Sequence, residues 1–160
     1  MTIKPLQPTD TAQVADFVLG IQNDEFNLGF APHEQPDLLN LSEFYAAGGF
    51  WVAKANGELV GTIGLQRLDE ETAILRKLFV KRELRGATPK VAQHLFDRLL
   101  TAARQLGFRT IYLDTPAIAA ASHRFYERNG FVEVTDKQTL PATYRYPDRD
   151  SRVYRLRLAE

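Results

Sequence analysis

A chain of 160 residues is long enough for one domain that buries most of the apolar surface of its unfolded form, and nothing in it marks a second domain. Lysine plus arginine (20) equals aspartate plus glutamate (20), so no overall field favours nucleic acid or an anionic membrane as a partner. Without cysteine, disulfides, thiolate metal sites and cysteine nucleophiles are excluded. Neither an apolar signal core nor a run of about 18 apolar residues is present, so we expect a cytoplasmic protein without a cleaved leader.

The first fifty residues predict a strand and two helices. The strand covers residues 3–6, and Thr9 or Asp10 can cap a first helix that fades near Glu25. A proline-containing loop follows, and a short second helix covers residues 38–45 before two glycines end it.

Apolar and polar residues then alternate, which predicts strands. Residues 50–55 and 59–65 flank Asn56-Gly57, a pair that favours a tight hairpin because both turn positions need positive φ. A third strand over residues 73–80 follows a polar turn, so three antiparallel strands come in a row.

The second half of the chain alternates between helices and strands. A long helix with a broad apolar stripe links two strands into one parallel crossover unit. The predicted elements are a helix over 88–106, a strand over 110–114, a helix over 117–128, a strand from Phe131, a mobile connection over 135–151 and a final strand over 152–158, with Arg155 and Arg157 on one face.

The turn between the strand over residues 73–80 and the long helix contains several groups that favour binding of an anion. Arg85-Gly86 leads into the first turn of the helix, where free backbone N–H groups carry partial positive charge. Thr88 can act as N-cap, Pro89 fits the first helical position, and Lys90 adds a cation. The pattern favours a phosphate site, and the alternative is an ordinary capped helix.

The order of elements, together with Leu75–Val80, Arg85-Gly86 and Arg124–Phe131, resembles the GNAT superfamily of N-acetyltransferases across nearly the whole chain. In that family an Arg/Gln-x-x-Gly-x-Gly/Ala motif opens the helix, and its amides hold the CoA pyrophosphate. Arg85 matches the first place, whereas Thr88 and Lys90 replace small residues. We hypothesise that the Thr88 hydroxyl and the Lys90 ammonium contact phosphate oxygens in place of lost amide contacts.

The resemblance implies a fold, a co-substrate and a set of binding residues. The fold is an α/β (α+β), largely antiparallel sheet of six to seven strands with helices on both faces, in the order β-α-α-β-β-β-α-β-α-β-β, as one domain over residues 1–160. Its fourth and fifth strands splay apart so that the pantetheine arm of acetyl-CoA lies between them. The implied cofactor-binding residues are Leu78, Phe79, Val80, Arg85, Gly86, Ala87, Thr88, Lys90, Val91, Asp114 and Tyr126.

The segment Phe125–Phe131 reproduces a second family signature, Phe-Tyr-Glu-x-x-Gly-Phe. In the family this tyrosine commonly lies near the CoA sulfur and gives a proton to the leaving thiolate. Tyr126 is therefore the candidate general acid. The alternative is a tyrosine that only packs against the sheet.

The general base has several candidates. Glu25 and Glu71 are weak candidates, and Glu25 could instead bind a substrate ammonium or face solvent. Relatives often carry glutamate where this chain has Ile74. Asp114 ends the strand that enters the crossover unit, where ligands of α/β sheets collect, so we rank it as a site residue; it could equally cap the next helix.

An acidic rim could receive a cationic amine. Glu25, Glu34 and Asp37 would form it, with Phe26, Phe30 and Trp51 as apolar contacts; alternatively Phe26 and Trp51 are core and the acids face water. The three histidines lack metal-ligand spacing, so no metal is predicted.

Taken together, these features predict an acetyl-CoA-dependent N-acetyltransferase that acts on a small-molecule or peptide amine by direct transfer in a ternary complex. Edge strands in such a sheet allow a homodimer. Three alternatives stay open: a non-catalytic CoA-binding regulatory module of the same fold, an unrelated nucleotide-binding domain, and an interaction module that uses the arginine-rich final strand.

Overall fold

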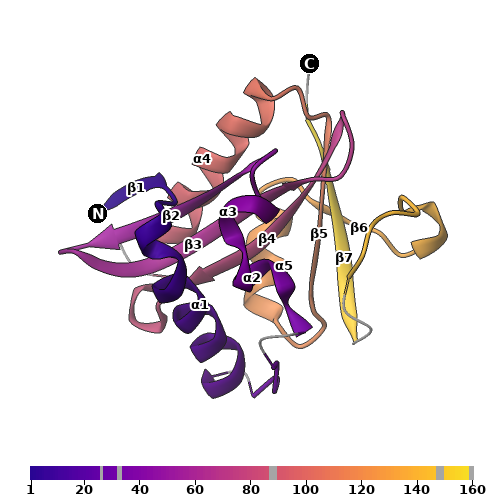
Figure 1. The fold of residues 1–160 in the computed structure, drawn as a ribbon. Helices are drawn as coiled ribbons and strands as arrows, with labels where there is room; N and C mark the ends of the chain where they lie inside the picture. Colours follow the sequence, from indigo (N-terminus) through magenta and orange to yellow (C-terminus); the bar gives the residue numbers. More distant parts are fainter. Residues whose placement is uncertain (26, 32–33, 87–89, 147–149, 159–160) are drawn as a thin grey trace.

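A seven-stranded sheet in the order β1-β2-β3-β4-β5-β7-β6 organises the chain (Figure 1). The computed structural model describes residues 1–25, 27–31, 34–86, 90–146 and 150–158. Its strands are β1 (Thr2–Pro5), β2 (Gly49–Ala55), β3 (Glu58–Arg67), β4 (Thr72–Val80), β5 (Thr110–Pro116), β6 (Val132–Glu133) and β7 (Ser151–Arg157). All neighbouring strands are antiparallel except β4 and β5, which are parallel. The predicted mixed, largely antiparallel sheet is thus confirmed.

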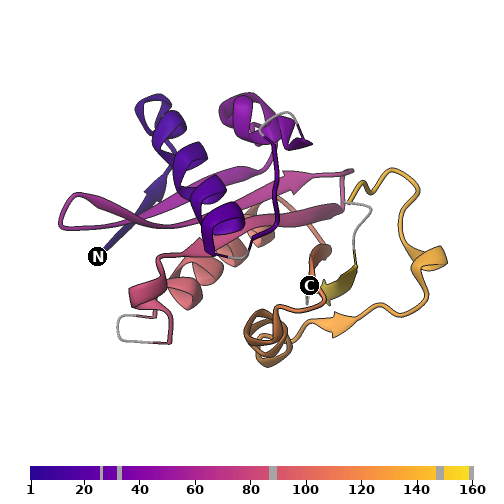
Figure 2. The ribbon, with the colours of Figure 1, turned by 90° about the horizontal axis from the view of Figure 1, so that it is seen from below.

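Helices cover both faces of this sheet (Figure 2). The α-helices are α1 (Thr11–Leu19), α2 (Pro36–Leu39), α3 (Leu41–Phe44), α4 (Val91–Gln105) and α5 (Ala120–Arg128). A π-helix, η2 (Gly20–Glu25), follows α1, and three-residue 3-10 helices are η1 (Pro8–Asp10), η4 (Arg82–Leu84) and η5 (Lys137–Thr139). Helices α1 to α3 pack on one face over Val52 and Leu59, and α4 and α5 pack on the other over Leu65 and Ile111. The order of helices and strands agrees with the predicted one, except that the second predicted helix is divided in two.

The predicted second helix is two short helices. Asn40 separates α2 from α3 with φ −151° and ψ 54°, which is outside the helical region. Its side-chain amide donates a hydrogen bond to the Glu43 carboxylate (2.5 Å). Asparagine favours such local hydrogen bonds over a continuous helix, which the apolar spacing alone did not reveal.

The hairpin between β2 and β3 has the predicted turn. Asn56 (φ 53°) and Gly57 (φ 78°) both adopt the left-handed conformation. The hairpin brings Trp51 opposite Ile63 in the sheet. Trp51 is buried in the main core with α4, so it is a core residue rather than an acceptor contact.

The connection from β6 to β7 is more ordered than predicted. Tyr144 in this segment is buried and packs with Ile74, Tyr112 and Val153 in a separate apolar cluster. Earlier in the same segment, Asp136 caps η5 by accepting a hydrogen bond from the Gln138 amide. The packing of Tyr144 corrects the prediction that the whole of residues 135–151 is a mobile connection.

A β-bulge in β4 determines which way two charged side chains point near the functional site. The register between β3 and β4 shifts between Thr62 and Gly64, and Lys77 has φ 58°. The Thr62 hydroxyl fixes the bulge by donating to the Lys77 carbonyl (2.7 Å). Because a bulge interrupts strand alternation, the neighbours Arg76 and Lys77 both contact groups on the face of α1 to α3. Within the described ranges, no helix has the length and apolarity to cross a membrane.

Candidate functional site

The central feature of the site is a split between β4 and β5. The two parallel strands pair at only three positions, ending at Ile74 opposite Tyr112. Beyond these residues they diverge toward their carboxyl ends (Figure 1), so the edge of β4 that faces β5 carries no ladder pairing from Leu75 onward. The predicted splay is therefore present, and an unpaired strand edge offers backbone donors and acceptors to an extended ligand.

After β4 the chain turns toward α4. This turn borders the open end of the split, which is called its mouth below. Arg85 and Gly86 follow η4, and α4 begins at Val91 after Lys90 as N-cap. Gly86 has φ 68°, and a Cβ built on it would meet nothing within 4 Å, so its backbone is open to approach. The predicted contributions of Ala87, Thr88 and Pro89 lie outside the described residues.

Two predicted site residues meet at this mouth. The Arg85 guanidinium donates to both carboxylate oxygens of Glu25, at the end of η2, and one of these contacts measures 2.9 Å. A third Arg85 nitrogen, Nε, donates to the Val80 carbonyl (2.9 Å). The candidate pyrophosphate ligand and the candidate acceptor-side carboxylate are thus partners in this structure, a pairing that sequence spacing did not indicate.

Tyr126 lies on α5 against the sheet. Its ring is 6% exposed and packs against Phe125, Phe131 and Tyr154. Burial, and secondly the charge of Asp114, raise the pKa of the Tyr126 phenol well above its usual value. Because its pKa is raised, the phenol stays protonated at physiological pH.

Asp114 marks the base of the split. It lies on β5 two residues beyond the last β4–β5 pair, and its carboxylate accepts a hydrogen bond from the Tyr144 hydroxyl (2.7 Å). Across the split, Arg76 Nη1 is 3.7 Å from the same carboxylate oxygen. Arg76 is itself held by the Gln66 side chain and the Arg145 carbonyl. The carboxylate is thus a member of a fixed polar group and does not cap α5.

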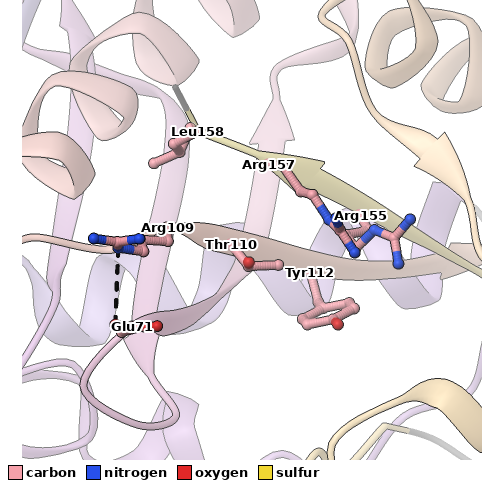
Figure 3. Close-up of a pocket in the computed structure, with 7 residues that line it drawn as sticks. All are labelled: Glu71, Arg109, Thr110, Tyr112, Arg155, Arg157 and Leu158. Carbon is pink, nitrogen blue, oxygen red and sulfur yellow. Dashed lines mark ion pairs between the residues drawn. The ribbon is translucent and has the colours of Figure 1, made fainter. Parts of the chain in front are cut away.

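Glu71 lies at the other end of the strands. It precedes β4, at the amino ends of β4 and β5, whereas the split opens at their carboxyl ends. Its carboxylate is 3.8 Å from Arg109 Nε on the rim of a separate pocket that also contains Arg155 and Arg157 (Figure 3). The structure does not bring Glu71 together with Arg85 or with the other predicted site residues.

A buried cluster of charged side chains lies beside the split, and the sequence alone did not predict it. Lys77 Nζ is 3.3 Å from the Asp37 carboxylate, which also accepts a hydrogen bond from the Tyr45 hydroxyl (2.7 Å). The side chains of Lys77 and Asp37 are 12% and 7% exposed, so Asp37 neither faces water nor belongs to an open acidic rim. Burial lowers the pKa of Lys77, and Asp37 partly offsets that effect. Two adjacent charges inside an apolar strand, Arg76-Lys77, are the sequence signal of the bulge that creates this cluster.

Metal ligands form no cluster in the described part of the chain: no group of three or more histidine, aspartate or glutamate side chains there could hold a metal ion.

Residues 15–131 match the Acetyltransferase (GNAT) family. An acetyltransferase from Streptococcus agalactiae has a crystal structure that superposes with a TM-score of 0.92 at 38% identity, covering 98% of both chains. N-acetylaspartate synthetase from Danio rerio is 32% identical over 69% of this chain, which spans 41% of the length of that relative. A GNAT family acetyltransferase from Elizabethkingia anophelis, crystallised with acetyl-CoA bound, shares the fold with a TM-score of 0.62 at 16% identity, covering 98% of this chain and 97% of its own.

The seven-stranded sheet, the β4–β5 split and the helix that begins at its mouth define an acetyltransferase fold. The chain belongs to the GNAT family of N-acetyltransferases.

Proposed function

We propose that the protein transfers an acetyl group from acetyl-CoA to a primary amine by direct attack of the amine in a ternary complex. The observation that carries this proposal is the split between β4 and β5, which leaves the edge of β4 unpaired from Leu75 onward. A ternary complex requires no acyl-enzyme, which agrees with the absence of cysteine.

The residues around the split fit acetyl-CoA. In this proposal the pantetheine arm pairs with the β4 backbone at Leu78, Phe79 and Val80. The pyrophosphate binds at the turn before α4. Its proposed ligands are Arg85, Gly86, Lys90 and the amide of Val91, joined by Ala87 and Thr88 from outside the described residues. The fit rests on the free β4 edge, the open backbone at Gly86 and the N–H groups of the first α4 turn.

The chemistry divides between the two sides of the split. A neutral amine attacks the thioester carbonyl of acetyl-CoA, the carbon–sulfur bond breaks after the carbon–nitrogen bond forms, and the nitrogen releases a proton to solvent. Tyr126 donates a proton to the departing sulfur, and its raised pKa keeps the phenol in the proton-bearing form. Asp114 acts as a positioning residue that holds Arg76 and Tyr144 at the base of the split. Glu25 can meet the amine only after it leaves Arg85.

The acceptor class is proposed from a relative, because the charges beside the split are already paired with one another: Arg76 with Asp114, and the buried Lys77 with Asp37. One relative is named N-acetylaspartate synthetase, so amino acids, aspartate included, head the amine panel.

Calorimetric titration with acetyl-CoA, CoA and ATP tests the co-substrate. We expect saturable binding of both CoA species, weaker binding by Arg85→Ala, and unchanged binding by Tyr126→Phe. Binding of ATP in preference to CoA, or no binding of either CoA species, would contradict the proposal.

Release of free CoA thiol with a panel of amines then tests turnover. Thiol release that depends on one amine and falls in Tyr126→Phe supports the enzyme. CoA binding without thiol release from any amine would instead support the alternative, a regulatory module that kept the fold.

A further inference from the structure

A pocket of about 330 Å³ lies on the sheet face that α4 and α5 leave uncovered (Figure 3). Two cross-strand pairs build its floor: Thr110 on β5 is opposite Arg157 on β7, and Tyr112 is opposite Arg155. Residues paired in this way project from the same face of a sheet. Arg109, Glu71 and Leu158 complete the lining. The pocket lies at the amino end of β5, away from the opening of the β4–β5 split.

The pocket carries a surplus of positive charge from its two β7 arginines. Arg155 and Arg157 line it beside the Glu71–Arg109 ion pair, although the chain as a whole is neutral. Among the described residues, the Glu71 carboxylate forms an ion pair with Arg109 alone, at 3.8 Å. Neither Arg155 nor Arg157 forms an ion pair or a hydrogen bond through its side chain with a described residue. Their Cα atoms are about 7 Å apart along the strand, so two unneutralised guanidinium groups lie side by side.

An anion would balance this surplus of positive charge. Like charges at that separation repel one another, and a bound anion removes the repulsion. A guanidinium group presents a planar fork of donors that matches a carboxylate or a phosphate. The Thr110 hydroxyl adds a neutral donor, and the buried ring of Tyr112 supplies an apolar wall. The volume lies at the low end of the range for small-molecule sites, about 300 to 1,000 Å³.

We propose that the pocket formed by Arg109, Arg155, Arg157, Thr110 and Tyr112 is an oxyanion site that binds a carboxylate or phosphate group of a small ligand. The site is distinct from the proposed acetyl-CoA site, and anion binding to it does not require turnover; only the assignment of the anion to the acceptor rests on the proposed function. It is connected to the base of the split, because the Tyr112 ring packs against Tyr144 (centroids 5.8 Å apart), whose hydroxyl holds Asp114. The anion belongs either to the acceptor or to a separate ligand.

Calorimetric titration with inorganic phosphate and with succinate at low ionic strength tests the site. We expect saturable binding to the unmodified protein and a loss of affinity of about tenfold or more in Arg155→Gln/Arg157→Gln, because two charge-assisted contacts are removed. The control Arg98→Gln/Arg128→Gln removes the same charge from exposed positions on α4 and α5 and should bind within about twofold of the unmodified protein. Equal binding by the pocket variant and the unmodified protein, or no saturable binding, overturns the proposal.

Thermal unfolding without added anion gives an independent readout. Since the two arginines repel each other, Arg155→Gln/Arg157→Gln should keep or raise the melting temperature at low salt, and added phosphate should raise it only in the unmodified protein. A clear drop in melting temperature would show that the arginines serve the fold, and would overturn the proposal.

Inhibition by phosphate at saturating acetyl-CoA separates the two sources of the anion. Inhibition that competes with the acceptor supports the site and assigns the anion to the acceptor. Non-competitive inhibition or activation that is lost in Arg155→Gln/Arg157→Gln supports the site and assigns the anion to a separate ligand.

Discussion

Arg85 and Glu25 form a two-point ion pair across the mouth of the β4–β5 split. A guanidinium that binds a carboxylate through two nitrogens offers the same fork that it would offer to a phosphate. Glu25 therefore occupies the contacts of Arg85 that the proposed pyrophosphate ligand would use. The pair is partly exposed, at 33% for Arg85 and 21% for Glu25, so its contribution is small enough for a ligand to displace it.

Glu25→Gln should tighten CoA binding. Removing the carboxylate releases the Arg85 contacts that Glu25 occupies and removes a like charge from the proposed phosphate site, so we expect the dissociation constant of CoA to fall about two- to fivefold. Calorimetric titration at low and high salt measures this effect, and the gain should shrink at high salt. Glu43→Gln removes an exposed carboxylate from α3 and serves as the control. Weaker CoA binding by Glu25→Gln would mean that the pair organises the site instead of competing for it.

The sequence predicted the framework of the site better than its contacts. Hydrophobic periodicity and the Asn56-Gly57 turn were sufficient for the order of strands and helices, because these are local signals. The partnership of Glu25 with Arg85 was hidden, since 60 residues separate the two. The Lys77–Asp37 pair was hidden because it depends on a bulge, which moves one side chain to the opposite face. Register and long-range pairing are set by the whole sheet and leave little trace in neighbouring residues.

Tyr126→Phe should lower turnover without weakening acetyl-CoA binding. We expect kcat to fall about 100-fold, because a positioned acid commonly contributes that much, with a dissociation constant within about twofold. The raised pKa of the phenol also predicts that ionisation of Tyr126 does not lower kcat below about pH 10. Tyr154→Phe is the control, since its hydroxyl donates to Glu127 in the same aromatic cluster. An unchanged kcat in Tyr126→Phe would show that Tyr126 is not the general acid.

Asp37→Asn should destabilise the fold by about 3 kcal/mol, because it leaves the buried Lys77 charge without its partner. Loss of the carboxylate also lowers the pKa of Lys77 further below that of an unfolded lysine. The folded variant then binds fewer protons than its unfolded chain, so its free energy of unfolding should rise from pH 7 to pH 9. Urea unfolding at both pH values measures this change.

The double variant Asp37→Asn/Lys77→Met is the matched control for that experiment. Without the buried ammonium, the dependence on pH should disappear and part of the lost stability should return. A single variant as stable as the unmodified protein would show that water reaches Lys77 and solvates its charge.

Tyr144→Phe should make the protein less sensitive to alkaline pH. Burial, Asp114 and the hydrogen bond to it raise the pKa of the Tyr144 phenol far above that of an unfolded tyrosine, about 10. Above pH 10 the unfolded chain therefore loses a proton that the folded chain retains, and stability falls by up to about 1.4 kcal/mol per pH unit for this one group.

Tyr144→Phe removes that proton difference and also a hydrogen bond to a carboxylate. It should cost about 2 kcal/mol at pH 7, while its free energy of unfolding declines less steeply from pH 9.5 to pH 11. Urea unfolding across this range gives both quantities. Parallel curves for the variant and the unmodified protein would mean that Tyr144 ionises in the folded state as readily as in the unfolded one, and that the Tyr144–Asp114 contact does not persist in solution.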